Sequence, residues 1–186
     1  MADIRRFVIG PNDQGLSAVL SHELTNVQEV PGIFWRASLW ATNESPADNT
    51  ISEDRAKTIT TREPEGEGLI FRALEIPPDI SDTQHHRAVL HELNKNVKQK
   101  YSPTETDLRR HPSMHRTETL DCFAIVFGEI YIVTDADEAL LRPGDTVIVR
   151  GVNHAWSNRS DKPAVIIGTM THAAAWPAEQ YPAPGR

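Results

Sequence analysis

Short apolar runs, each closed by turn residues, dominate the hydrophobic pattern of this chain. Five such runs stand out: GIFWRASLWAT (residues 32–42), GLIFRALEIPPD (68–79), CFAIVFGEIYIVTD (122–135), EALLRPGDTVIV (138–149) and PAVIIGTMTHA (163–173). Runs of this length, rich in β-branched and aromatic residues and bounded by Pro, Gly or Asp, are typical of strands. The pattern therefore predicts a mostly β chain with many tight connections.

The remaining stretches have a different character. Residues 6–30 contain short apolar pieces that we expect to be strands or extended segments, and the polar residues 43–68 predict a long surface loop. Residues 81–100 are the one convincing helix. Its apolar stripe repeats at four-residue spacing and consists of Val89, Leu93 and Val97.

Composition narrows the class of protein. A chain of 186 residues with 13 Pro and 10 Gly fits one turn-rich domain with a sizeable core. Its 19 Lys and Arg against 26 Asp and Glu give a net charge of −7. Nucleic-acid binding is therefore not expected, because the basic surface on which it depends is missing.

The single cysteine, Cys122, excludes a framework of internal disulfides and fits a reducing compartment. We expect it to be an inert, packed thiol. No apolar run is long enough for a signal peptide or a membrane span, so a cytoplasmic protein with no membrane partner is expected.

Two polar clusters interrupt the apolar runs: HPSMHRTETLD at residues 111–121 and RGVNHAWSN at residues 150–158. Successive side chains of a strand point to opposite faces. One face of the first cluster carries His115, Thr117, Thr119, Asp121 and Phe123. One face of the second carries His154, Trp156 and Asn158. If the flanking strands lie side by side in a small barrel, both faces line one polar mouth above an apolar interior.

With these residues the chain resembles the cupin superfamily, whose members are small jelly-roll barrels with two signature motifs. The second motif, Pro-x-Gly-x2-His-x3-Asn, matches at Gly151, His154 and Asn158. Val149 stands where the motif has proline. The first motif matches less completely.

In that first motif, His115 and the closing Gly128 are in place. Thr117 occupies the position of the second motif His, and Asp121 occupies the position of the motif Glu. The resemblance is closest to a subfamily of small single-domain cupins that carry the MHRTETLD and RGVNHAWSN stretches.

The resemblance implies a fold. We expect an all-β double-stranded β-helix, the jelly-roll barrel of cupins, with extra amino-terminal strands and one short helix. A single cupin domain would span residues 1–186, with its core barrel at about 68–172. Residues 1–67 would pack on the barrel or on a partner, and residues 173–186 would form a tail. A homodimer is expected by the same resemblance, and unpaired sheet edges give it a physical motive.

The resemblance also implies a metal site. Cupins usually bind a divalent metal through motif His and Glu side chains, so His115, His154 and Asp121 would be the ligands here, for Zn, Fe, Mn or Ni. Thr117 is a poor ligand because it is a neutral hydroxyl. His111 could replace the nitrogen lost at that position. A metal-free pocket is the alternative.

Without metal, the same side chains could act as general acid and base, because a His beside a carboxylate is held in one tautomer near neutral pH. The expected catalytic residues are His115, Thr117, Asp121 and His154. The expected substrate-binding residues are His111, Phe123, Trp156 and Asn158.

These residues predict an enzyme that acts on a small molecule in the barrel mouth. A lyase or decarboxylase acting on a small carboxylated or aromatic metabolite is preferred, because a metal or a protonated His can stabilise the enolate-like charge of such steps. A metal-dependent dioxygenase and a non-catalytic module that binds or senses a small ligand are the alternatives.

Overall fold

The computed structural model describes residues 4–80, 84, 88–89 and 100–181. Antiparallel pairing joins the strands of this part of the chain into three sheets. The large sheet has the order β3 (Val27–Val30), β4 (Phe34–Ala41), β5 (Leu69–Ile76), β11 (Ala164–His172), β6 (Thr119–Phe127) and β9 (Thr146–Arg150). The small sheet has the order β10 (His154–Ser157), β7 (Ile130–Thr134) and β8 (Glu138–Leu141). The third sheet is a hairpin of β1 (Val8–Pro11) and β2 (Ser17–Ser21).

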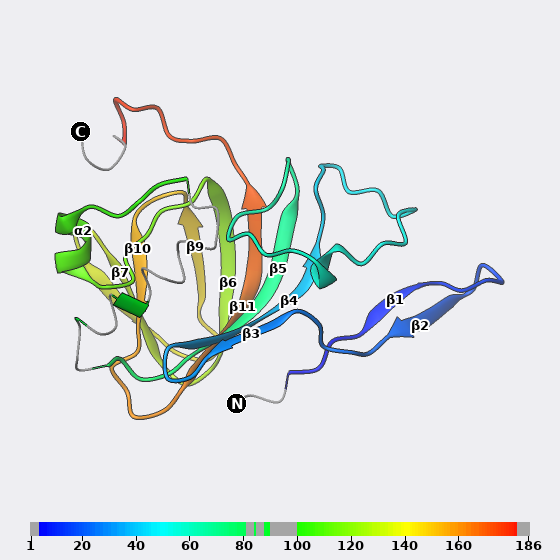
Figure 1. The fold of residues 1–186 in the computed structure, drawn as a ribbon, viewed down its shortest axis with the longest axis horizontal. Coiled ribbons are helices and arrows are strands. Elements are labelled where there is room, and N and C mark those ends of the chain that lie inside the picture. Colours follow the sequence, from blue (N-terminus) through cyan, green and yellow to red (C-terminus); the bar gives the residue numbers. More distant parts are fainter. Residues whose placement is uncertain (1–3, 81–83, 85–87, 90–99, 182–186) are drawn as a thin grey trace.

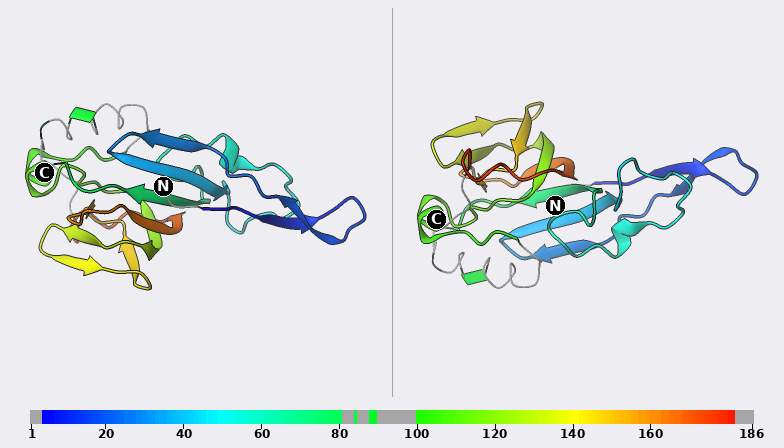
Figure 2. Two further views of the ribbon diagram at one scale, coloured as in Figure 1. Left: turned by 90° about the horizontal axis from the view of Figure 1, so that it is seen from below. Right: turned by 90° about the horizontal axis from the view of Figure 1, so that it is seen from above.

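The large and small sheets face each other, and the hairpin β1–β2 extends away from them (Figures 1 and 2). Between the two sheets lies an apolar cluster of buried side chains that includes Phe123, Ile125, Ile130, Ile166 and Met170. The chain is thus an all-β double sheet of the jelly-roll type, and the prediction of the fold class is confirmed.

Strand β6 shows the expected alternation of buried and exposed side chains. Thr119, Asp121 and Phe123 are buried, whereas Leu120 and Cys122 are exposed on the outer face. The parity argument is therefore correct for this strand. The expectation that Cys122 is a packed thiol is wrong, because nothing in the described chain covers this outer face over the residue.

At Gly168 the neighbouring strand lies too close for any side chain. Gly168 pairs with Arg72 on one side and with Phe123 on the other. A Cβ atom at this position would lie 2.0 Å from the carbonyl oxygen of Cys122 and 2.6 Å from Cδ1 of Phe123. Glycine is therefore required here, because the Cys122 backbone and the Phe123 ring leave no space for a Cβ atom.

Helical structure is sparse among the described residues. Helix α2 (Glu105–Arg110) was not predicted, although Thr104 and Asp107 form a capping box at its start. A single 3-10 turn, η1 (Arg55–Lys57), interrupts the loop after β4. The helix predicted over residues 81–100 lies outside the described residues except at 84, 88–89 and 100. Among the helices that are described, none has the length and apolar character to cross a membrane.

Candidate functional site

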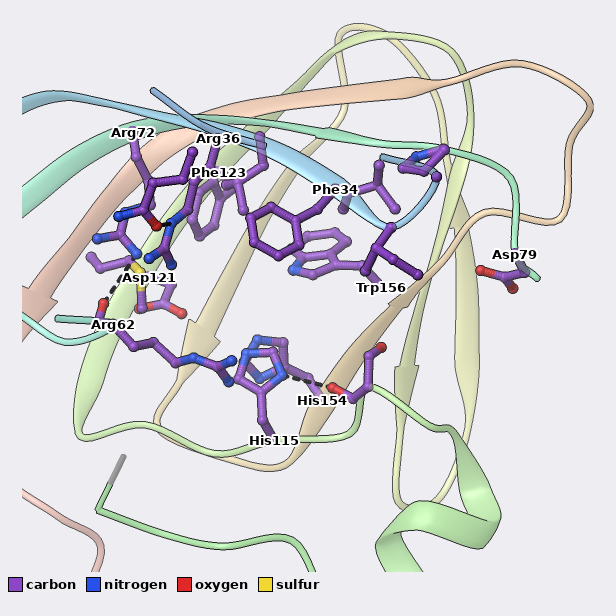
Figure 3. Close-up of a pocket in the computed structure, with 18 of the residues that line it drawn as sticks. Phe34, Arg36, Arg62, Arg72, Asp79, His115, Asp121, Phe123, His154 and Trp156 are labelled. Carbon is purple, nitrogen blue, oxygen red and sulfur yellow. Dashed lines mark hydrogen bonds between the residues drawn. The ribbon is translucent and has the colours of Figure 1, made fainter. Parts of the chain in front are cut away.

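A cavity of about 430 Å³ opens between the two sheets. Its lining comes from strands β3, β4, β5, β6, β10 and β11, from the turn between β3 and β4, and from the segments before β5, after β5 and before β6. Figure 3 shows three groups of side chains in it, with arginines at one end, aromatic rings in the middle and Asp79 at the other end. Five of the residues predicted from the sequence line it: His115, Asp121, Phe123, His154 and Trp156.

The two motif histidines lie side by side. His115 and His154 form an isolated antiparallel bridge, in which each backbone N–H donates to the carbonyl of the other at 2.9 Å. Their ring centroids are 4.3 Å apart. Because His115 precedes β6 and His154 opens β10, this bridge joins the large sheet to the small one. The convergence predicted from the two polar clusters is therefore present.

Backbone carbonyls fix the tautomer of both rings. Nδ1 of His115 lies 2.9 Å from the carbonyl oxygen of Ser113, and Nδ1 of His154 lies 3.0 Å from that of Val152. A carbonyl only accepts, so Nδ1 carries the proton in each ring and Nε2 carries the lone pair. Both rings thus offer an unprotonated nitrogen to the site.

Both imidazoles are also held neutral. Burial lowers the pKa of His154 to about 4. Burial, the neighbouring His154 and the charge of Arg62 lower the pKa of His115 well below its usual range. Removing a cationic imidazolium from water is costly, so each ring stays uncharged at neutral pH.

Asp121 belongs to a different part of the cavity from the histidines. Burial raises the pKa of its carboxyl to about 6, although a hydrogen bond from Thr119 and the charge of Arg72 oppose the shift. Its Oδ1 has no hydrogen-bond partner in the described chain. Thr117, predicted as a catalytic residue, does not line the cavity; its hydroxyl bonds that of Thr119 at 2.7 Å. The threonines therefore support Asp121 rather than the imidazoles.

The predicted metal set is only partly assembled. His115 and His154 line the cavity, but no group of three or more His, Cys, Asp or Glu side chains that could hold a metal ion occurs among residues 4–80, 84, 88–89 and 100–181. Asp121, predicted as the third ligand, is engaged by Thr119 and Arg72. The donor set thus does not fit the three-ligand site, and metal binding stays a prediction.

Two predicted substrate residues lie outside the cavity lining. Asn158 follows the end of β10, where its Nδ2 donates to the carbonyls of Ile76 and Lys162, both at 2.8 Å, and so fixes a turn. His111 accepts a hydrogen bond at Nδ1 from the Ser113 backbone N–H at 3.2 Å. Its Nε2 lies 3.9 Å from Asp79, at the edge of the cavity.

Three arginines that the sequence analysis did not single out complete the site. Arg36 lies on β4, Arg62 in the loop before β5 and Arg72 on β5, and all three line the cavity. Burial is the largest cause of a lowered pKa in each, to about 10 for Arg62 and about 9 for Arg72. All three remain cationic at neutral pH. A lone arginine inside each of the apolar runs 32–42 and 68–79 was the available signal.

The double sheet is of the cupin type, and the paired motif histidines lie where its two sheets are joined. Solved structures similar to it include the cupin domain of Cnp3 from Schizosaccharomyces pombe, which is 12% identical at a TM-score of 0.45 over 92% of this chain and 89% of that one. A Thermotoga maritima protein described as a predicted oxalate decarboxylase is 12% identical at a TM-score of 0.44, over 81% of this chain and 94% of that one. These likenesses concern the fold only.

Among curated proteins, the similarity is confined to a short segment. Phomopsin biosynthesis cluster protein D of Diaporthe leptostromiformis is 48% identical over 48 residues, 25% of each chain. Oryzines biosynthesis cluster protein J of Aspergillus oryzae is 38% identical over 50 residues, 26% of this chain and 28% of that one. The match thus spans about a quarter of the length of these relatives. No protein-family model matches the chain.

Proposed function

We propose that this chain is a small-molecule enzyme of the cupin type, a lyase or decarboxylase acting on a small carboxylated or aromatic metabolite in the cavity between its sheets. The observation that carries the proposal is the pair of neutral imidazoles that line the cavity, each anchored at Nδ1 and each with an unprotonated Nε2. Paired groups of this kind supply both general-base and general-acid steps.

The reaction follows from the two rings. Nε2 of one imidazole takes a proton from a substrate carbon, and the electron pair of the broken C–H bond forms a new C=C bond. The leaving group departs with its own bonding pair and takes up the proton that this Nε2 has accepted, which restores the neutral imidazole. Because the two ring centroids are 4.3 Å apart, the second imidazole is close enough to act on the same small substrate.

Substrate charge would activate the pair. A low pKa makes the free imidazoles weak bases, but a bound anion beside them favours the protonated form and raises their pKa. The rings thus become effective proton acceptors only when an anionic substrate is present. An empty cavity would keep them neutral.

The proposal is tested by incubating the purified protein in D₂O with a panel of small carboxylic acids and following each C–H resonance by proton NMR. Loss of an α-hydrogen signal, with or without a new alkene signal, is the expected result. Unchanged spectra for the whole panel, from protein that is folded and binds panel members, would favour a binding module.

A non-catalytic module that binds or senses a small ligand is the second candidate. The lowered pKa of both imidazoles favours it, because a ring with a pKa of about 4 is a poor proton acceptor at neutral pH. A metal-dependent dioxygenase is the third. Finding a stoichiometric divalent metal in protein purified without chelator would support the dioxygenase.

We also propose that the chain forms a homodimer through its hairpin β1–β2, in the cytoplasm, where Cys122 would stay reduced. Ile9 and Val19 pair across the hairpin and each is 58% exposed. The outer face of β6 and β9 likewise exposes apolar side chains, including Leu120, Val126 and Ile148. A second copy of this chain is the proposed partner that covers both exposed apolar surfaces.

Light scattering after size exclusion is expected to give twice the chain mass of 20.8 kDa. The double variant Ile9→Lys/Val19→Glu should be monomeric, because it makes the hairpin face polar while the two new charges attract across the strands. Gln14→Lys, at the turn of the same hairpin, is the control and should stay dimeric. A monomeric wild type would contradict the proposal, as would a double variant that remains dimeric.

A further inference from the structure

Positive charge is concentrated inside a protein whose net charge is −7. Arg36, Arg62 and Arg72 come from three different segments of the lining. Arg36 and Arg72 lie at one end of the cavity, and the side chain of Arg62 starts near them (Figure 3). Their charges act on one another: Arg36 lowers the pKa of both others, and Arg62 lowers that of Arg72. Three cations held this close are unfavourable unless an anion accompanies them.

The protein's own carboxylates balance this charge only in part. Asp121 is the acidic group that acts on Arg72, and Glu63 acts on Arg62. Of these two carboxylates only Asp121 lines the cavity, together with the three arginines. Asp79, the other acidic residue of the lining, is at the opposite end of the cavity (Figure 3). The arginine end therefore has an excess of positive charge.

The guanidinium groups are held in place with donors to spare. Arg72, only 3% exposed, donates from Nη1 to the Arg62 carbonyl at 3.1 Å and from Nη2 to the Thr61 carbonyl at 3.3 Å. Its Nε has no partner in the described chain. Arg36 donates from Nε to Oε1 of Gln28 at 2.7 Å. Because each guanidinium has five N–H donors, both groups are fixed by the protein and still able to bind an oxyanion.

One of these cations reaches the histidines. The side chain of Arg62 runs from the arginine end toward His115 and His154 (Figure 3). Its charge contributes to the lowered pKa of both rings, which agrees with this position. An anionic group bound by Arg62 would therefore lie beside the basic nitrogens.

The rest of the lining is suited to an apolar body. Phe34, Phe123 and Trp156 occupy the middle of the cavity (Figure 3). The Phe123 and Trp156 rings meet edge to face with centroids 6.0 Å apart. Trp156 is also edge-on to His154, at 6.3 Å. An aromatic or alkyl group would fit between the arginine end and Asp79.

From this arrangement we propose that Arg36, Arg62 and Arg72 form an anion subsite that holds the carboxylate of an organic acid with an aromatic or alkyl body, and that this carboxylate is retained in the reaction. The inference deepens the proposed function and rests on it for the site of reaction.

Retention follows from charge. When a carboxylate leaves as CO₂ it loses its negative charge, so guanidinium groups that bind it stabilise the reactant more than the transition state. When a proton leaves the carbon next to that carboxylate, negative charge grows on its oxygens, and the same groups stabilise the transition state. The proton passes to Nε2 of an imidazole, and the electron pair expels a leaving group from the neighbouring carbon. The subsite thus selects a lyase over a decarboxylase.

Binding measurements test the subsite directly. The probes are benzoate, its neutral analogue benzamide and inorganic phosphate, titrated into full-length protein by calorimetry and followed by the fluorescence of Trp156 and the other tryptophans. We expect benzoate to bind at least about tenfold more tightly than benzamide, a difference of about 1.4 kcal/mol. Arg62→Met and Arg36→Met should each weaken benzoate binding by about tenfold or more. Arg142→Met, at an exposed arginine beside Glu129, is the matched control and should bind like the wild type.

Several outcomes would overturn the inference. Equal affinity for benzoate and benzamide would do so. Unchanged benzoate affinity in both Arg variants would also do so, and circular dichroism would check that these variants are folded. If phosphate binds more tightly than benzoate, the ligand of the subsite would be a phosphate ester and not a carboxylate. If benzoate binds as expected while no acid of the D₂O panel reacts, the subsite stands and the proposed enzyme fails. If acids react but the Arg variants bind normally, the enzyme stands and the subsite fails.

Discussion

His154→Asn should slow the exchange of substrate α-hydrogens with deuterium by a factor of about 10²–10⁴, the usual contribution of a positioned general base. Asparagine can still donate from its side-chain amide to the Val152 carbonyl, as Nδ1 of His154 does at 3.0 Å. It has no counterpart of Nε2. The variant therefore preserves the local hydrogen bond and removes the atom that accepts the proton.

The measurement is the rate at which the α-proton resonance of a reactive acid disappears in D₂O. His172→Asn is the matched control, because His172 is exposed at the end of β11 and does not line the cavity. It should exchange at the wild-type rate. Exchange by His154→Asn at a similar rate, with unaltered binding of the acid, would mean that His154 is not the base. The parallel variant His115→Asn would then identify which ring accepts the proton.

Stability should fall as the pH is lowered from about 6.5 to about 4, and His154 alone should account for about 3 kcal/mol of the free energy of unfolding. Its pKa is about 4 in the folded protein, against 6.5 for a histidine that is free in water. Between these values the unfolded chain binds more protons, so acid favours unfolding. His115 acts in the same direction, since its pKa is also lowered.

Asp121 acts in the opposite direction. Its folded pKa of about 6 lies above the 3.8 of an aspartate that is free in water, so the folded chain binds more protons in that window and gains stability as the pH falls. The two imidazoles together change the free energy of unfolding more than the one carboxylate does, so a net loss of stability is expected as the pH falls. Urea unfolding at several pH values and one fixed protein concentration measures it. His154→Asn should flatten the dependence, and Asp121→Asn should steepen it. A His154→Asn profile parallel to that of the wild type would refute this assignment.

Local patterns predicted a mostly β chain and the inward-facing side of β6, whereas the jelly-roll arrangement was implied by the resemblance to cupins. Alternation along residues 115–123 placed Asp121 and Phe123 in the interior, and the two motifs brought His115 and His154 together. These features depend on strand parity and on spacing within one hairpin-rich stretch. Asn158 is buried as well but does not line the cavity, because β10 ends at Ser157 and the turn that follows directs its side chain to the carbonyls of Ile76 and Lys162.

The arginine end of the cavity could not be predicted in this way. Arg36 and Arg72 sit on strands with buried residues on both faces, so parity did not reveal which face meets the cavity. Arg62 comes from a polar loop, where no period constrains side-chain direction. Their convergence depends on the pairing of β4 with β5 and on the fold of the loop before β5, which are long-range properties of the chain.

The backbone bridge between His115 and His154 gives the pair an unusual kind of rigidity. Main-chain hydrogen bonds at 2.9 Å set the spacing of the two rings, and carbonyls of Ser113 and Val152 set their orientation. The distance between the bases is thus independent of the side chains around them. Neighbouring positions such as Phe34 and Trp156 could be exchanged to accommodate differently shaped substrates without disturbing the proton-transfer apparatus, which would make this scaffold readily adaptable to new chemistry at a constant centre.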